Sequence, residues 1–211
     1  MIIGERISRL FGGLSYTNIF GLLAAVLLVA GPDRLWAADF EKGADAYSRA
    51  DYAEALRQWQ PLAQQGDEIA AFRLGNMYYD GLGVYQNLGT AAKYYTLAAK
   101  RGHAAAQVRL GDMYSGGWGV RRSAKTAEFW WRAAIEKGNA DAALSLGVMY
   151  SKKRVNAKDC PETMRNLFTA EDWFQLASQL GNQNAARWLT QLQRRINSIK
   201  AQHNYRSECV E

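Results

Sequence analysis

The pattern Ala-x-x-x-Leu-Gly-x-Met-Tyr occurs three times in this 211-residue chain, with its glycine at positions 75, 111 and 147. A second glycine series, at positions 66, 102 and 138, keeps the same 36-residue spacing and ends with Gly181. A period of this length is typical of a repeat array, in which similar units stack and each unit contacts its neighbours. Such a stack presents an extended surface, so the sequence favours binding over catalysis in a deep pocket.

Each repeat is predicted to contain two helices. Apolar residues recur at intervals of three and four between Ile69 and Tyr79, which predicts an amphipathic helix. Gly81 and Gly83 end that helix, and Asn87 is able to cap a second one from Leu88 to Lys100. The residues expected on the buried face of the second helix are Ala91, Ala92, Tyr95, Ala98 and Ala99. The predicted unit is therefore a helical hairpin.

Four columns of equivalent residues support this hairpin in every unit. Two columns hold residues suited to capping helices, namely Asp51, Asn87, Ser123 and Asp159 in one and Asp67, His103, Asn139 and Asn182 in the other. Two further columns fit buried positions, with aromatic residues at Trp59, Tyr95, Trp131 and Phe174 and alanines at Ala55, Ala91, Ala127 and Ala170. Glycines 66, 102, 138 and 181 are expected to provide left-handed caps at the ends of the second helices.

The repeated motif resembles the Sel1-like repeat, a relative of the tetratricopeptide repeat. Its form is Leu-Gly-x-x-Tyr-x-x-Gly-x-Gly-Val, followed by an alanine, an aromatic pair and Ala-Ala-x-x-Gly. Residues 74–102 and 110–138 match closely, and the likeness extends over roughly residues 40–196. The resemblance implies an all-α fold, a right-handed α/α solenoid of antiparallel helical hairpins with about eight helices after the amino-terminal segment.

The predicted organisation has seven segments. In chain order they are an export signal (1–38), an entry half-repeat (39–66), repeat 1 (67–102), repeat 2 (103–138), a divergent repeat 3 (139–181), a capping helix (182–198) and a mobile tail (199–211). Repeat 3 has Lys153-Arg154-Val155-Asn156 in place of the glycine loop and seven additional residues. The additional residues either lengthen its second helix by two turns, or form a short helix followed by a loop.

The amino-terminal segment has the features of an export signal. Arg6 and Arg9 precede an apolar run from Ile19 to Ala30, and small residues allow cleavage near Ala38. The run is shorter than the roughly 20 residues of an ordinary membrane span. We expect a periplasmic or secreted protein, with an uncleaved amino-terminal membrane anchor as the alternative.

Few residues suggest chemistry. Cys160 and Cys209 form a disulfide or remain two free thiols, and the sequence leaves both alternatives open. His103 is expected to be a turn residue, and neither it nor His203 belongs to a cluster with metal-ligand spacing. No nucleophile elbow or phosphate-binding loop is present, so we expect no metal, no cofactor and no enzymatic activity.

The net charge of +6 is concentrated toward the carboxy-terminal end. The residues responsible are Lys152, Lys153, Arg154, Lys158, Arg165, Arg187, Arg194 and Arg195. This region is either a binding surface for an anionic envelope component or an ordinary solvated face. Export argues against a nucleic-acid partner.

In tetratricopeptide-like stacks the first helix of each hairpin lines the concave groove. The resemblance therefore gives as candidate partner-binding residues Arg73, Asn76, Tyr79, Asp80, Arg109, Asp112 and Ser115, with Ser145, Val148, Ser151 and Lys152 in repeat 3. We expect a non-catalytic adaptor of the bacterial-type cell envelope that holds a segment of another protein. The alternative is a binder or hydrolase of cell-wall or β-lactam ligands. Similar secreted repeats linked to β-lactams carry a cysteine pair in each repeat, whereas repeats 1 and 2 here carry none.

Overall fold

A computed structural model describes residues 32–152 and 160–202, which form nine α-helices and no strand. The helices are α3 (Pro32–Ser48), α4 (Tyr52–Gln65), α5 (Glu68–Asp80), α6 (Leu88–Lys100), α7 (Ala104–Gly116), α8 (Ala124–Ile135), α9 (Ala140–Ser151), α10 (Cys160–Gln179) and α11 (Ala185–Gln202). Within these residues, no helix has the length and apolar character needed to cross a membrane. The chain divides into two compact units, one ending at Leu62 and the other beginning at Ala63.

In the first unit, α3 and α4 pack around Trp59. The Trp59 indole is 1% exposed, and its Nε1 donates a hydrogen bond to the Phe40 carbonyl oxygen over 3.2 Å. Its ring stacks on Phe40 and also contacts Tyr47. The three residues of α3 that pack on it, including Gly43, all follow the predicted cleavage position at Ala38. The predicted entry hairpin therefore exists, and its packing uses residues that a mature chain would retain.

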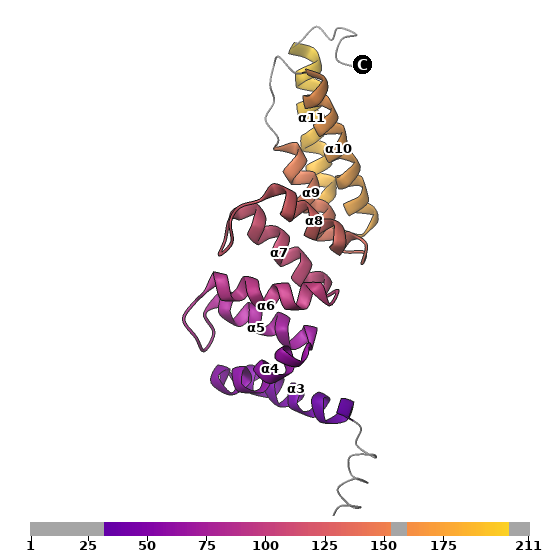
Figure 1. The fold of residues 1–211 in the computed structure, drawn as a ribbon. Coiled ribbons are helices and arrows are strands. Elements are labelled where there is room, and N and C mark those ends of the chain that lie inside the picture. Colours follow the sequence, from indigo (N-terminus) through magenta and orange to yellow (C-terminus); the bar gives the residue numbers. More distant parts are fainter. Residues whose placement is uncertain (1–31, 153–159, 203–211) are drawn as a thin grey trace, which may run out of the picture. The chain divides into compact units, whose positions relative to one another are not determined.

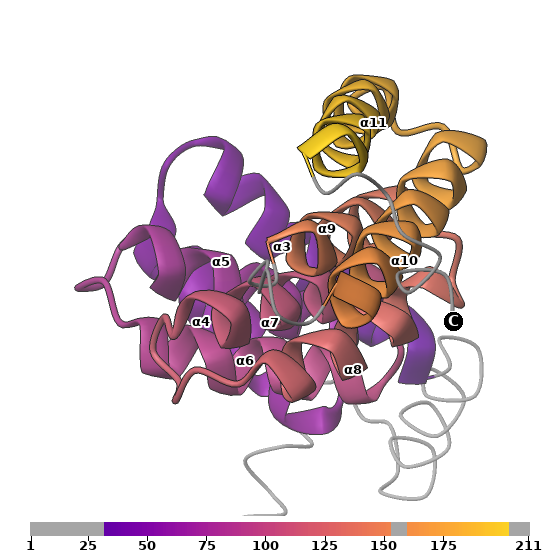
Figure 2. The same ribbon diagram turned by 90° about the horizontal axis from the view of Figure 1, so that it is seen from above.

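The second unit is a succession of antiparallel hairpins (Figure 1). Helix α5 pairs with α6, α7 with α8, and α9 with α10, while α6 packs on α7, α8 on α9, and α10 on α11. The first helices α7 and α9 also contact each other. Figure 2 shows the same succession from above, with α11 following α10 at the end of the series. The predicted arrangement of helical hairpins is confirmed.

The boundaries and buried faces of repeat 1 follow the prediction closely. Helix α6 has the predicted ends, and its buried residues are the five predicted ones. Helix α5 is one residue longer than predicted at each end. One detail was wrong, because Ile69 is 45% exposed and the buried positions near the start of α5 belong to Ala70 and Ala71. Ile69 lies in the first turn of α5, and its side chain points away from the buried face that carries Leu74 and Met77.

Capping hydrogen bonds define where the helices begin. The caps that accept a hydrogen bond from a backbone N–H two or three residues later are Asp51, Asp67, Asn87, His103, Ser123, Asn139 and Asn182. Asp159, the remaining predicted cap, lies outside the described residues. Gly102, Gly138 and Gly181 have φ angles of 94°, 77° and 92°, the left-handed conformation predicted for them.

The glycine of the Leu-Gly motif makes room for the aromatic residue of the partner helix. A Cβ atom on Gly75, Gly111 or Gly147 would lie closer than 3.0 Å to Tyr95, Trp131 or Phe174, respectively. These aromatic side chains are at most 3% exposed, and the alanine column beside them is fully buried. The repeated glycine of the first helix and the repeated aromatic residue of the second helix therefore pack directly against each other.

Repeat 3 differs from the other two in its second helix and at the end of its first. Helix α10 has 20 residues, whereas α6 has 13 and α8 has 12, so the additional residues lengthen the helix as the first alternative predicted. The C-cap residue of α9 is Lys152, in right-handed conformation, whereas the C-cap residues of α5 and α7 are glycines with positive φ. The guanidinium of Arg195, from α11, donates a hydrogen bond to the Ser151 carbonyl oxygen at this helix end.

The capping helix α11 extends farther than predicted. It continues to Gln202, so residues 199–202 are helical and do not belong to a mobile tail, and it begins at Ala185 and not at residue 182. Leu192 and Ile196 join Met164, Leu167 and Phe174 in the final part of the core, and Trp188 stacks on Phe174. Residues 203–211, the remainder of the predicted tail, lie outside the described part.

Candidate partner-binding groove

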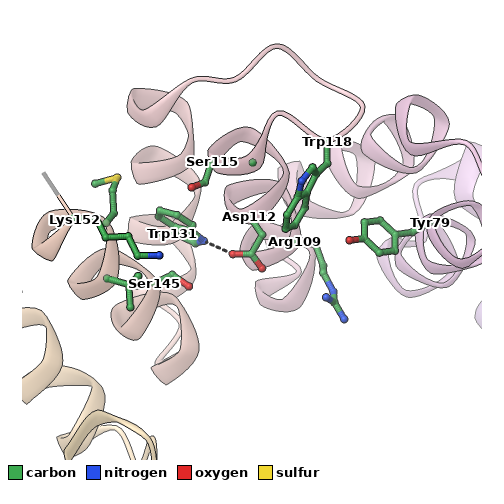
Figure 3. A pocket seen from close by; sticks show the side chains of 11 residues that line it. Tyr79, Arg109, Asp112, Ser115, Trp118, Trp131, Ser145 and Lys152 are labelled. Carbon is green, nitrogen blue, oxygen red and sulfur yellow. Dashed lines mark hydrogen bonds between the residues drawn. The ribbon is translucent and has the colours of Figure 1, made fainter. Parts of the chain in front are cut away.

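A groove crosses three successive first helices, α5, α7 and α9, and encloses about 500 Å³. It is lined by four of the seven residues predicted in repeats 1 and 2, which are Tyr79, Arg109, Asp112 and Ser115. Ser145, Val148 and Lys152 extend it onto α9. Figure 3 shows Tyr79 and Lys152 approaching it from opposite sides, with Asp112 between them. We refer to this surface, defined by its lining residues, as the α5–α7–α9 groove.

The floor of the groove is formed by Asp112 and Trp131. Trp131 Nε1 donates a hydrogen bond to Asp112 Oδ1 over 3.2 Å (Figure 3). Burial raises the pKa of the Asp112 carboxyl, while the Trp131 hydrogen bond and the positive charge of Arg109 act in the opposite direction. The Oδ1 oxygen of this carboxylate therefore takes part in a hydrogen bond between α7 and α8.

The same contact recurs in the neighbouring repeats with different chemistry. In repeat 1 the Tyr95 hydroxyl donates to Asn76 Oδ1 over 2.8 Å, and in repeat 3 the equivalent residues Val148 and Phe174 are both apolar. Asn76, although predicted as a groove residue, therefore serves the packing of α5 on α6 and does not line the groove. In each repeat the residue of the first helix is chemically suited to the aromatic residue of the second. The amide of Asn76 accepts from the Tyr95 hydroxyl, the carboxylate of Asp112 accepts from the Trp131 indole, and the valine of repeat 3 packs in the cluster of the phenylalanine.

Positive side chains surround the floor. Arg109 and Lys152 are exposed, and neither lies within ion-pair distance of a carboxylate in residues 32–152 or 160–202. Arg122 Nε donates a hydrogen bond to the Ser115 carbonyl oxygen over 3.0 Å. The equivalent hydrogen bond in repeat 1 runs from Gln86 Nε2 to the Tyr79 carbonyl oxygen. The groove therefore has three cations on or beside its lining and one partly buried carboxylate.

Besides Asn76, three other predicted residues lie off the groove. Arg73 and Asp80 are exposed but do not line the groove, and Ser151 is buried, with its hydroxyl donating to the Val148 carbonyl oxygen. Ser151 faces the α10–α11 side, where its own carbonyl receives Arg195. The groove is thus centred on repeat 2, and the first helix of repeat 1 contributes only its carboxy-terminal end.

Sequence reasoning missed Trp118. This residue follows Gly117 in the loop after α7, its side chain is 47% exposed, and it lines the groove. Its indole lies against Gly116, where a Cβ atom would be 2.5 Å from the ring. A signal was present in the sequence, because repeat 1 has the smaller Leu82 at this position and an aromatic residue in a glycine loop lies outside the periodic buried face.

His103 is a structural residue, as predicted. Its Nδ1 accepts a hydrogen bond from the Ala106 backbone N–H, and its ring stacks on Phe72 with a centroid distance of 4.4 Å. Burial lowers its pKa. Within residues 32–152 and 160–202, no group of three or more histidine, cysteine, aspartate or glutamate residues is arranged to hold a metal ion.

The remaining predicted features lie only partly within the described residues. Arg165, Arg187 and Arg194 are exposed on α10 and α11, whereas Lys153, Arg154 and Lys158 lie outside the described residues. Cys160 begins α10, but its side chain and the whole of Cys209 are not described. The disulfide between them, the export signal and the anionic-surface interaction stay predictions.

Comparison with known proteins identifies the repeat. The family model described as Sel1 repeat matches residues 69–103, 104–139 and 162–182. A solved structure of a protective antigen from uropathogenic Escherichia coli strains, described as displaying an SLR fold, is 28% identical, with a TM-score of 0.64 over 74% of this chain and 33% of that one. A Sel1 repeat protein from Oxalobacter formigenes is 27% identical, with a TM-score of 0.59 over 71% of this chain and 59% of that one.

The chain thus spans a third of the first of these proteins and less than two thirds of the second. No curated protein sequence gives a match. The matched repeats coincide with hairpins α5–α6 and α7–α8 and with much of α10. Proteins of this repeat class generally act as non-catalytic scaffolds for protein–protein interaction. The chain therefore contains three matches to the Sel1 repeat, and its helical hairpins form an α/α solenoid similar to those of its structural neighbours.

Proposed function

We propose that this protein is a non-catalytic adaptor that holds an extended segment of another protein in the α5–α7–α9 groove. The observation that carries the proposal is that one open groove collects side chains from the first helices of three successive repeats. A segment lying across those helices would contact each repeat in turn, which is how a solenoid converts a repeated unit into a recognition surface.

The lining supports binding of a polypeptide. Tyr79, Ser115 and Ser145 offer hydroxyls that can donate to or accept from a peptide backbone. Trp118 offers an exposed aromatic surface, and Arg109 and Lys152 offer charges not used in ion pairs within the described residues. This mixture of one apolar platform with spaced polar groups is typical of interfaces that read a segment by both shape and charge.

We also propose that the adaptor works in the bacterial-type cell envelope, in the periplasm or outside the cell. The support comes from the amino-terminal sequence, with its basic residues, its short apolar run and the small residues before Ala38. Fractionation of cells that produce the full chain, followed by amino-terminal sequencing, tests this part. Retention of an intact amino terminus in the cytoplasm would contradict it.

Site-specific photocrosslinking tests the groove. A photoreactive amino acid placed at Ser115 or Ser145 in the full chain should give covalent adducts with one partner in native cells. The matched control is Lys93, which is exposed on the second helix α6 and does not line the groove. Adducts that form equally at Lys93, or at no groove position, would contradict the proposal. Turnover of a penicillin-type substrate by the purified protein would instead favour the enzymatic alternative.

A further inference from the structure

The α5–α7–α9 groove has an excess of positive charge that its own structure does not neutralise. The guanidinium of Arg109 and the ammonium of Lys152 line it without a carboxylate partner in the part of the chain that the structure describes. Arg122 lies beside Ser115, and its Nε donates a hydrogen bond to the Ser115 carbonyl oxygen. Unpaired cations on a binding surface favour a ligand of opposite charge and set its register.

The single carboxylate on the lining does not cancel these charges. Asp112 is partly buried, and its Oδ1 accepts the hydrogen bond from Trp131. Its column equivalents are Asn76 and Val148, so the position serves helix packing in every repeat and is not specialised for a ligand. Asp141, a nearby acidic residue, is exposed and receives the side-chain N–H of Asn182 over 2.7 Å.

An apolar contact adjoins the charged one. The Trp118 indole is 47% exposed and lies in the loop between α7 and α8, above the floor formed by Asp112 and Trp131 (Figure 3). An aromatic face held against a glycine backbone is pre-ordered, so an apolar side chain can pack on it with little loss of conformational freedom.

We infer that the partner segment is acidic, with at least one aspartate or glutamate side chain between Arg109 and Lys152 and an apolar side chain packed on Trp118. This inference rests on the proposed function and adds to it the chemistry of the ligand. Asp112 then weakens the interaction, because its negative charge faces a ligand of the same sign. Replacing the cations and replacing Asp112 should consequently change affinity in opposite directions.

The experiment uses the purified chain and a displayed library of random peptides about nine residues long. Peptides selected by the protein are sequenced, and the best is titrated by fluorescence anisotropy against charge-neutralising variants. Arg109→Gln and Lys152→Gln should each weaken binding by roughly two- to fivefold, less so at high salt, as expected for exposed charge pairs. Asp112→Asn, which keeps an acceptor for Trp131, should tighten it. Arg73→Gln is the matched control, since Arg73 occupies the same column as Arg109 but lies off the groove.

The outcomes separate this inference from the proposed function. Enrichment of aspartate and glutamate, with opposite effects of the Arg109 and Asp112 variants and none of Arg73→Gln, supports it. Selected peptides that lose binding when Ser145→Trp fills the groove, yet carry no acidic residues and are insensitive to Arg109→Gln, overturn the inference and leave the adaptor function standing. A selection in which no peptide depends on the groove overturns both. Circular dichroism of each variant verifies the fold.

Discussion

At the scale of single residues, the repeat depends on a glycine beneath an aromatic ring. Gly111 lies in α7, directly under the Trp131 side chain of α8, with no space for a Cβ atom. Helix propensity would favour alanine over glycine at an interior helical position by about 1 kcal/mol. The glycine is present because close packing with the indole outweighs that preference.

Overpacking a core usually costs about 1–3 kcal/mol, and the gain in helix propensity offsets about 1 kcal/mol of this cost. Gly111→Ala should therefore lower the free energy of unfolding by up to about 2 kcal/mol. Urea denaturation followed by circular dichroism measures it. Gly89→Ala in the first turn of α6 is the control, because the atoms nearest to an added Cβ atom are 3.4 Å away or farther and no aromatic ring is displaced. Equal effects of the two substitutions would show that the indole contact does not determine the glycine.

His103 provides a pH-dependent contribution at the same scale. Burial lowers its pKa below the ordinary value of 6.5, and its Nδ1 must be unprotonated to accept from Ala106. The unfolded chain then binds more protons than the folded one, so the stabilisation is complete above about pH 6.5 and is lost as the pH falls through the folded pKa. Unfolding free energies measured between pH 8 and pH 5 should show this decline.

His103→Asn separates that effect from other titrations. Asn139 and Asn182 occupy the same column and act as caps, so asparagine preserves the hydrogen bond without a titrating group. The variant should show a smaller decline in unfolding free energy between pH 6.5 and pH 5 than the unaltered protein. An unchanged decline would mean that the pH dependence arises elsewhere.

At the scale of helices, the end of α9 is held differently from the ends of α5 and α7. Those two helices are capped by Gly81 and Gly117 in left-handed conformation, whereas the cap of α9 is not a glycine and Arg195 reaches the last turn of α9 from α11. A cation at a helix carboxy terminus satisfies a free carbonyl and complements the helix dipole.

Arg195→Ala should lower the unfolding free energy by about 1–2 kcal/mol, because a charge-assisted hydrogen bond to the Ser151 carbonyl is lost. Arg194→Ala is the matched control, since Arg194 precedes it on α11 and is exposed. Thermal or urea denaturation of both variants measures the difference. A loss of the same size in both would indicate a general effect of charge or helix propensity and not a capping contact.

Helices were the level at which the sequence was most informative. Periodicity and capping residues predicted α6 to the residue and α5 within one residue at each end, because the buried face and both caps of each helix are local features. Four of the seven partner-binding candidates that the resemblance gave in repeats 1 and 2 line the groove, while their role in binding stays a prediction. Trp118 and the role of Arg195 were missed, because a loop conformation and a contact between α9 and α11 depend on tertiary structure that no periodic pattern contains.

At the scale of the whole molecule, contacts in the second unit are confined to helices that are close in the chain. Each helix packs mainly on the one before and the one after it. Stability in such arrays is roughly a sum of unit stabilities and nearest-neighbour interfaces, so a local defect weakens its surroundings more than distant units.

Leu192→Ala tests this locality. Leu192 is 4% exposed and packs in a core cluster with Met164, Leu167 and Phe174, so its truncation should cost about 2–5 kcal/mol. Hydrogen exchange with mass spectrometry should show the largest loss of protection in α9, α10 and α11, and little change in α5 and α6. Uniform loss of protection across these helices would indicate one fully cooperative unit.

The Arg195 contact also bears on how this array can lengthen. A glycine cap belongs to its own repeat, so a duplicated 36-residue unit brings its own helix end and can be inserted between repeats 1 and 2. The end of α9 is instead completed by a residue two helices later, beyond the longer α10. A new unit inserted after repeat 3 would separate α9 from that arginine. We therefore expect that units of this array can be duplicated between repeats 1 and 2, whereas the hairpin α9–α10 and helix α11 must be kept together as one unit.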